Sequence, residues 1–149
     1  MPSASIKKII PCTKENLIKM VLDIEKYPEF VPWCIKGKIY EHKEKGDRIE
    51  IIADLTIGKK FFSETYKSFV VYKKSDNSIH VTNIEGPLKY LENKWFFKEK
   101  DNNSEVNFHI DFELKNKILN TLMLKFFNIG LERIADAFEK RAIELFKNT

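Results

Sequence analysis

The sequence is poor in the residues that build disulfide frameworks, metal sites and phosphate-binding loops. Its 149 residues include two Cys, three His, five Gly and five Pro. Cys12 and Cys34 form no CxxC pair, so the sequence predicts no disulfide framework and favours a reducing compartment. His42, His80 and His109 fall on three separate predicted strands, without Cys, Asp or Glu at metal-ligand spacing. We therefore expect no metal site and no resident cofactor.

Long apolar runs, clustered arginines and catalytic motifs are also missing. No apolar run approaches the roughly 18 residues of a membrane-spanning helix, and the N-terminus lacks a signal-peptide core. We expect a cytoplasmic bacterial protein, with peripheral contact at the inner membrane as a further expectation. Only three of the 26 basic residues are Arg, which counts against a dedicated nucleic-acid site. The chain has no Gly-rich phosphate loop, nucleophile elbow or Cys–His pair, so we expect no enzyme.

The fold is organised around the C-terminal stretch of the chain. Residues 117–147 contain no Pro and one Gly, and their apolar residues recur at steps of three and four. This period predicts an amphipathic α-helix about 45 Å long, with Asn116 as its N-cap. The predicted apolar face consists of Leu119, Leu122, Met123, Phe126, Ile129, Ile134, Phe138, Ala142 and Leu145. So long a helix needs a cover over this face.

The rest of the chain supplies that cover as strands. A strand is expected at residues 3–10, followed by a helix with Thr13 as N-cap and Leu17, Met20, Val21 and Ile24 facing inward. Alternation of apolar and polar residues then predicts six strands, at 35–42, 49–57, 62–72, 79–83, 91–97 and 106–114. The predicted fold is α+β: a curved antiparallel sheet of about seven strands wrapped around the C-terminal helix, in one domain over residues 1–149.

Residues 27–34 form an apolar, aromatic stretch between the first helix and the second strand. Pro28 and Pro32 exclude a regular helix there and favour extended geometry at Tyr27 and Val31. Two interpretations stay open for this stretch. It forms either a lid that closes one end of the core, or the mouth of a pocket or interaction surface.

Four motifs resemble the signatures of one family. They are Tyr27-Pro-Glu-Phe-Val-Pro-Trp-Cys34, Glu64-x-Tyr66-x-Ser68-x-Val70, Glu85-Gly86-Pro87-Leu88-x5-Lys94-Trp95 and Ala137-Phe138-Glu139-Lys140-Arg141-Ala142. Their order and spacing are similar to those of the coenzyme Q-binding and polyketide cyclase-like START family, which includes the bacterial ribosome association toxins. The chain departs from this family at Leu88, where Phe is more frequent. The resemblance implies the helix-grip fold, in agreement with the fold expected from the periodicities.

The resemblance implies two kinds of function, and a fold does not choose between them. Some members bind ubiquinone and support respiration, whereas others bind the large ribosomal subunit and block its joining to the small one. We favour a lipid chaperone with ubiquinone or a related isoprenoid lipid as its ligand. The alternative is a ribosome-binding toxin that uses the basic first half of the chain, where residues 1–75 carry 15 basic and 10 acidic side chains. A small-molecule enzyme with Glu64 as acid or base ranks last.

A quinone site needs a long apolar slot with a few polar groups for the quinone oxygens. Tyr66, Ser68 and Asn93 would supply those groups, and residues 118–129 together with Trp33 would dip into a bilayer surface. Each of the aromatic residues would equally well pack in an ordinary core. The predicted ligand-binding residues are Tyr27, Phe30, Trp33, Phe62, Tyr66, Ser68, Asn93, Trp95, Phe97, Phe108, Phe112, Leu122, Met123, Phe126 and Phe127.

Overall fold

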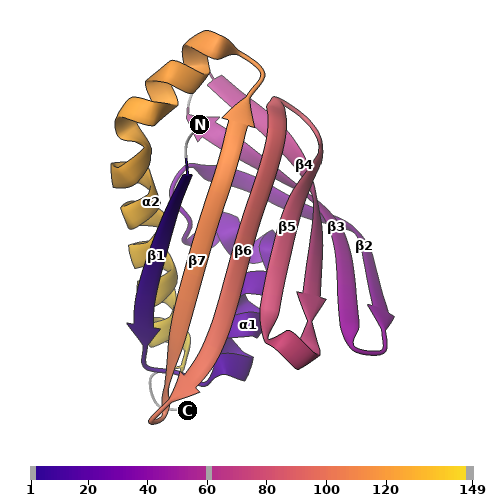
Figure 1. Ribbon diagram of the computed structural model, residues 1–149, viewed down its shortest axis with the longest axis vertical. Helices are drawn as coiled ribbons and strands as arrows, with labels where there is room; N and C mark the ends of the chain where they lie inside the picture. The colour runs from indigo at the N-terminus through magenta and orange to yellow at the C-terminus, as the bar shows by residue number, and fades with distance from the viewer. Residues whose placement is uncertain (1–2, 60–61, 147–149) are drawn as a thin grey trace.

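The protein folds as one curved antiparallel sheet with two helices and a short 3-10 turn on the same face (Figure 1). The computed structural model describes residues 3–59 and 62–146, without the side chains of residues 59, 62, 119, 122–124 and 126. The helical elements are α1 (Lys14–Leu22), η1 (Ile24–Glu29), η2 (Lys74–Asp76) and α2 (Lys117–Phe146). The strands are β1 (Ser3–Ile10), β2 (Cys34–Lys45), β3 (Arg48–Lys59), β4 (Phe62–Lys73), β5 (Ser78–Glu85), β6 (Leu88–Lys100) and β7 (Asn103–Leu114).

The seven strands are arranged in the order β1-β7-β6-β5-β4-β3-β2, and each neighbouring pair is antiparallel. Strands β2 to β7 form a meander, and β1 joins its far edge beside β7. Only Asp101 and Asn102 separate β6 from β7. Both have positive φ, 50° and 68°, as a tight two-residue hairpin turn requires. The predicted seven-stranded sheet with a long C-terminal helix is confirmed.

Helix α1 begins as the sequence predicts. The Oγ1 atom of Thr13 accepts the N–H of Asn16 at 3.2 Å, and the four residues expected to face inward are all buried. The chain then continues through η1, which includes Tyr27 and Pro28, so the extended geometry predicted at Tyr27 is wrong. Proline fixes φ near −65°, which suits a 3-10 turn as well as an extended chain.

The close packing of η1 against β2 depends on one glycine. A Cβ on Gly37 would lie 2.4 Å from the carbonyl oxygen of Ile24, so no other residue fits there without moving the backbone. This contact holds the aromatic stretch 27–34 against the open end of the sheet.

Helix α2 begins and runs largely as predicted. The Oδ1 atom of Asn116 accepts the N–H of Ile118 at 3.0 Å, as expected of an N-cap, and Phe138 and Ala142 are buried. Ile129 and Leu145, expected on the same face, are 58% and 47% exposed. Ile129 precedes Ile134 by five residues, which places it about 140° around the helix axis. Leu145 lies in the last turn of the helix, where it stays half exposed.

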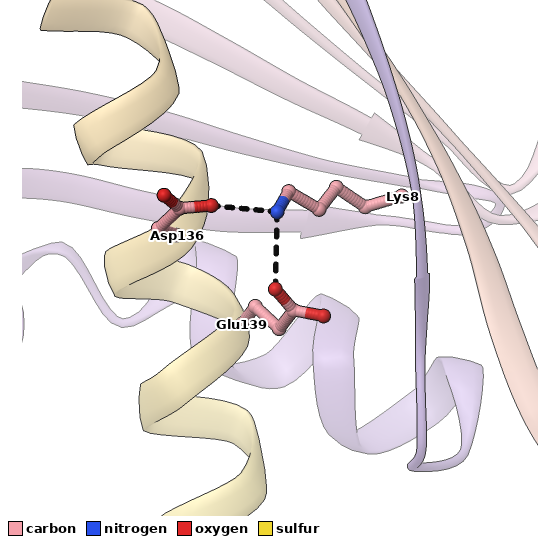
Figure 2. A network of polar contacts seen from close by, with 3 residues as sticks. All are labelled: Lys8, Asp136 and Glu139. Carbon is pink, nitrogen blue, oxygen red and sulfur yellow. Dashed lines mark hydrogen bonds and ion pairs between the residues drawn. The ribbon is translucent and has the colours of Figure 1, made fainter.

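Two polar contacts fix the C-terminal half of α2. The Nζ atom of Lys8 on β1 donates to Asp136 Oδ1 at 2.6 Å and to Glu139 Oε1 at 3.0 Å (Figure 2). On the other side, Arg141 donates to Glu29 Oε1 at 2.7 Å, and its guanidinium lies 5.2 Å from the centre of the Phe30 ring. These contacts hold the helix over the inner face of the sheet.

Candidate functional site

A cavity of about 200 Å³ lies between the inner face of the sheet, α1, the η1 segment and α2. Alternate residues of β3 to β7 point into it because side chains of a strand alternate between the two faces. The described lining residues are Val21, Ile24, Tyr27, Val31, Cys34, Ala53, Leu55, Ile57, Ser68, Val70, Ile79, Val81, Asn93, Trp95, Phe108, Ile110, Leu131, Ile134 and Phe138. None of these residues is charged, so the cavity suits a neutral, mainly apolar guest.

Two polar side chains from the sheet interrupt the apolar lining. They are Ser68 on β4 and Asn93 on β6. The Oδ1 atom of Asn93 is buried and has no hydrogen-bond partner among the described residues. A buried acceptor without a donor costs free energy, so a guest with a hydrogen-bond donor, such as a hydroxyl group, would be stabilised beside it.

Phe138 of α2 is the centre of the aromatic packing at one end of the cavity. Its ring makes edge contacts with Tyr27, Phe30 and Trp95, at centroid distances of 5.4, 5.1 and 5.3 Å. Trp95 in turn meets the edge of Phe108 at 4.7 Å. These aromatic contacts give this wall a defined shape, so the cavity is preformed rather than created by a guest.

The titratable groups of the cavity stay neutral. Burial raises the pKa of Tyr27 well above its usual range, and the Tyr27 hydroxyl donates to the carbonyl oxygen of Val21. Burial likewise raises the pKa of the Cys34 thiol. A protonated thiol is a poor nucleophile, so the cavity wall offers a guest no activated nucleophile at Cys34.

The structure brings together some of the predicted ligand residues. Tyr27, Ser68, Asn93, Trp95 and Phe108 border the cavity. That they bind a ligand stays a prediction.

Other predicted ligand residues lie elsewhere in the described structure. Phe97 is buried and stacked on Trp95 at 6.2 Å, and Phe112 packs against Phe127 at 5.3 Å. Phe30 packs on the far side of Phe138, away from the cavity. Period-two alternation finds the inner face of a strand but not how far along it the cavity extends, so Phe97 and Phe112 could not be placed relative to the cavity from the sequence. The side chains of Phe62, Leu122, Met123 and Phe126 lie outside the described residues.

Three more predicted site residues have positions of their own. Tyr66 lies on the inner register of β4 but does not border the cavity, and the same is true of Glu64. Trp33 has a φ of 64°, and its ring lies 3.8 Å from where a Cβ on Gly130 would be. Trp33 therefore packs against the middle of α2. The stretch 27–34 contributes Tyr27, Val31 and Cys34 to the cavity wall, so part of it acts as a wall of the pocket.

Sequence reasoning missed most of the aliphatic lining. Ala53, Val70 and Val81 were placed on strand faces but not assigned to a site, and the helix side was sought at residues 122–127. Within the described residues, α2 lines the cavity through Leu131, Ile134 and Phe138. Their spacing of three and four was visible in the sequence and would have identified this part of the wall.

The described residues offer neither a metal site nor a membrane-spanning helix. No three His, Cys, Asp or Glu residues of the described chain are grouped so that they could hold a metal ion. No helix within residues 3–59 and 62–146 is long and apolar enough to cross a membrane.

Comparisons with known proteins agree with this architecture. The family model described as polyketide cyclase / dehydrase and lipid transport matches residues 11–139. The ribosome association toxin RatA of Rickettsia prowazekii is 36% identical over 143 residues, which cover 94% of this chain and 95% of that protein. The mitochondrial coenzyme Q-binding protein COQ10 of Dictyostelium discoideum is 31% identical over 134 residues, which cover 88% of this chain and 64% of that protein.

A solved structure supports the same fold. The START superfamily protein from Mycobacterium smegmatis superposes with a TM-score of 0.79 at 20% identity, and the match covers 96% of this chain and 98% of that one. Together with the match over residues 11–139, this likeness agrees with the family indicated by the four sequence motifs. The chain therefore belongs to the polyketide cyclase / dehydrase and lipid transport family, with its START-like helix-grip fold.

Proposed function

We propose that this protein binds a hydrophobic small molecule in its cavity, and that the ligand is an isoprenoid quinone such as ubiquinone. The observation that carries the proposal is an uncharged, mostly apolar cavity containing one buried amide oxygen without a partner among the described residues. This combination of an apolar wall and a few polar groups is typical of sites for neutral lipids with a polar head. The 31% identity to a coenzyme Q-binding protein supports the choice of quinone.

The size of the cavity fits the head of such a lipid. An apolar cavity of about 150 Å³ is enough to take up benzene, so about 200 Å³ accommodates a substituted ring. The isoprenoid tail would extend from the ring toward the N-terminal half of α2, where the sequence of residues 118–129 is most apolar. Peripheral contact between this part of the protein and a bilayer would let the lipid enter and leave.

The Asn93 amide serves both redox forms of a quinone. Its Nδ2 group would donate to a quinone carbonyl oxygen, and its Oδ1 atom would accept from a quinol hydroxyl. The Ser68 hydroxyl, two strands away at about 4.8 Å per strand, would reach the opposite side of the ring. The protein acts as a carrier of the lipid and not as an enzyme, because the proposed contacts hold the ring without transferring a group.

A pair of substitutions on α2 tests this proposal. Ile134→Phe places a larger side chain in the cavity wall, whereas Ile129→Phe makes the same change at a position that is 58% exposed. Binding of a short-chain ubiquinone is measured by isothermal titration calorimetry. We expect Ile134→Phe to lose most of the binding and Ile129→Phe to keep it. Absence of binding to the wild-type protein, or equal binding by both variants, would contradict the proposal.

A second candidate function is association with the large ribosomal subunit. It is favoured by the relative from Rickettsia prowazekii, which is 36% identical, matches over 95% of its own length and is named a ribosome association toxin. Co-sedimentation of the protein with purified large subunits at increasing salt tests this candidate. Binding that persists in Ile134→Phe would show that ribosome association does not need the open cavity.

A further inference from the structure

A polar hollow of about 160 Å³ lies on the outer face of the sheet, opposite the lipid cavity. It is lined by Lys36, Lys38, Tyr40, Asp54, Thr56 and Thr65, and we call it the β2–β4 pocket. Asp54, which lines this pocket, lies on β3 between Ala53 and Leu55, and those two residues face the cavity. Because successive side chains of a strand point to opposite faces, the pocket lies on the other side of the sheet. No part of the proposed lipid site uses this surface.

The lysines of the pocket carry positive charge that is not paired in a salt bridge within the described residues. The ammonium groups of Lys38 and Lys67 each lie 4.9 Å from the centre of the Tyr40 ring. Both lysines are direct cross-strand neighbours of Asp54, yet within the described structure neither of them, nor Lys36, forms an ion pair. Two ammonium groups held at one exposed ring, with Lys36 lining the same pocket, attract an anion.

The floor of the same pocket contains an acceptor that has no donor. Asp54 Oδ2 accepts the Tyr40 hydroxyl at 2.7 Å, but its Oδ1 atom is buried without a partner among the described residues. Beside it, the Thr56 and Thr65 hydroxyls bond to each other at 3.0 Å. A ligand that fits must therefore supply both an anion for the lysines and a hydroxyl donor for Asp54.

We infer that the β2–β4 pocket binds the ribose-phosphate backbone of single-stranded RNA. Each nucleotide of RNA carries a phosphate and, one sugar away, a 2′-hydroxyl that can donate a hydrogen bond. The phosphate lies among Lys36, Lys38 and Lys67, and the 2′-hydroxyl donates to Asp54 Oδ1. DNA supplies the phosphate but not the hydroxyl, so the pocket distinguishes the two.

The outer face continues from this pocket in a way that suits RNA. Next to Lys67 on β4, Phe69 and Val71 line a second, open hollow of about 600 Å³, together with the polar residues Ser78, His80 and Thr82. At its far end Arg48 and Lys73 pair with Glu50 and Asp76 at 3.4 and 3.5 Å, so among the described residues of this surface the unpaired cations lie at the β2–β4 pocket. An aromatic side chain beside such cations is a feature with which sheets bind single-stranded RNA, through base stacking and phosphate contacts. A bilayer surface would use the cations but has no need of the hollow beside them.

This inference deepens the second candidate function, ribosome association, and does not depend on the lipid cavity. It predicts that ribosomal RNA is the part of the subunit that this face contacts. The test is designed so that the pocket and the ribosome candidate can fail separately.

The experiment measures fluorescence anisotropy of a labelled single strand of about ten nucleotides, as RNA and as DNA of the same sequence, over a range of salt concentrations. The test variant is Lys38→Gln with Lys67→Gln. The matched control is Lys98→Gln with Lys100→Gln, which removes the same charge from exposed positions of β6. Asp54→Ala is the third variant. Vesicles containing phosphatidylglycerol are the comparison ligand.

We expect the wild-type protein and the Lys98/Lys100 control to bind RNA more tightly than DNA. The Lys38/Lys67 variant should lose about tenfold in RNA affinity, and its log–log salt slope should fall by about 1.4, which corresponds to two phosphate contacts. Asp54→Ala should bind DNA more tightly, because a negative charge is removed, and should no longer prefer RNA. Equal RNA affinity of the Lys38/Lys67 variant and its control would overturn the inference. So would a Lys38/Lys67 variant that loses binding to the vesicles but keeps its binding to RNA.

Co-sedimentation with large ribosomal subunits separates the two claims. If the Lys38/Lys67 variant still sediments with the subunit as the wild type does, the ribosome candidate holds and the inferred RNA surface is wrong. If the variant loses binding to the RNA strand but even the wild type does not sediment with subunits, the pocket binds RNA and the ribosome candidate fails.

Discussion

Replacing Asn93 by Leu should make the protein more stable and its lipid binding weaker. Leu is similar to Asn in shape, but it removes the buried oxygen that has no hydrogen-bond partner among the described residues. It also turns one of the two polar side chains of the cavity wall into an apolar one. Stability and binding therefore change in opposite directions if the amide is kept for the ligand.

The size of both effects follows from the hydrogen bonds involved. An unsatisfied buried polar group costs about 1–3 kcal/mol, so the free energy of unfolding of the ligand-free protein should rise by about that amount. For a chain of this length, the melting temperature should rise by about 2 to 12 °C. The bound quinone loses one hydrogen bond, about 0.5–1.5 kcal/mol, so its affinity should fall by about 2- to 10-fold.

A neighbouring asparagine provides the matched control. On β5, Asn83 Oδ1 accepts the N–H of Leu91 at 2.9 Å, and its Nδ2 group donates to the carbonyl oxygen of Leu88 at 3.4 Å. The same substitution, Asn83→Leu, breaks these bonds and should lower the free energy of unfolding by about 1–3 kcal/mol. Thermal and urea unfolding of the two ligand-free variants is compared with the wild type, and ubiquinone affinity is measured by calorimetry.

The reasoning is refuted if Asn93→Leu destabilises the ligand-free protein as much as Asn83→Leu does. That result would mean that the Asn93 amide is already hydrogen-bonded, for example to water in the cavity. The cavity would then be a hydrated space, and the argument that its amide awaits a ligand would fail.

Three further predictions concern the packing of α2. Phe138→Ala should lower the free energy of unfolding by about 3–5 kcal/mol in urea titrations, because three aromatic rings lose their contact with it; a loss below about 1 kcal/mol would contradict its central place. Hydrogen bonds from Lys8 to Asp136 and Glu139 raise the pKa of Lys8 above 10.5, so their stabilisation is complete below that pH and is lost as pH rises through the raised pKa. Wild type and Lys8→Met should thus differ in denaturation midpoint at neutral pH and converge in strong alkali. The hydrogen bond from Arg141 lowers the pKa of Glu29 below 4.5, so the stabilisation by this contact is present above pH 4.5 and is lost as pH falls through the lowered pKa. The denaturation midpoint of Glu29→Gln should therefore match that of the wild type only in strong acid.

Controls for the two pH predictions come from the same strand and the same turn. Lys7 is the neighbour of Lys8 and pairs with Glu105 on the outer face of the sheet, so Lys7→Met removes a charge without touching α2. Glu25→Gln is the corresponding control for Glu29→Gln. It removes one carboxylate charge at a residue that accepts the N–H of Ile39, whereas Arg141 donates to Glu29. For each variant, the difference from the wild type in denaturation midpoint is followed as pH rises. If this difference disappears in strong alkali for Lys7→Met as it does for Lys8→Met, the contact between β1 and α2 is not its cause.

The sequence predicts the elements of this fold well because each one has a strong local signal. The alternation from Val106 to Leu114 and the three- and four-residue steps of α2 both appear as expected, and Thr13 and Asn116 act as caps. The 3-10 geometry at Tyr27 was missed because proline fits both backbone regions. Ile129 was misplaced because a long apolar stripe does not reveal which part of the helix the sheet covers.

The site was less predictable than the fold. Ser68 and Asn93 were predicted as polar contacts together with Tyr66, and of these three only Ser68 and Asn93 border the cavity. Which aromatic residues fill space and which leave it empty depends on side chains from five strands and two helices, as the contrast between Phe108 at the cavity and Phe97 in the core illustrates. The β2–β4 pocket joins Lys36 to Thr65 across three strands, and no local pattern marks such a group.

The pairing of β1 with β7 has a consequence for the order of folding. Ser5 and His109, 104 residues apart, lie opposite each other in the finished sheet. At a translation rate of about 5–20 residues per second, β1 waits about 5–20 s for its partner strand to be made. The meander from β2 to β7 can pair progressively during that time, because each strand follows its neighbour directly. Helix α2, which lines the cavity through Leu131, Ile134 and Phe138, is made after every strand of the sheet, so a ligand present during synthesis would find the sheet open before the helix covers it.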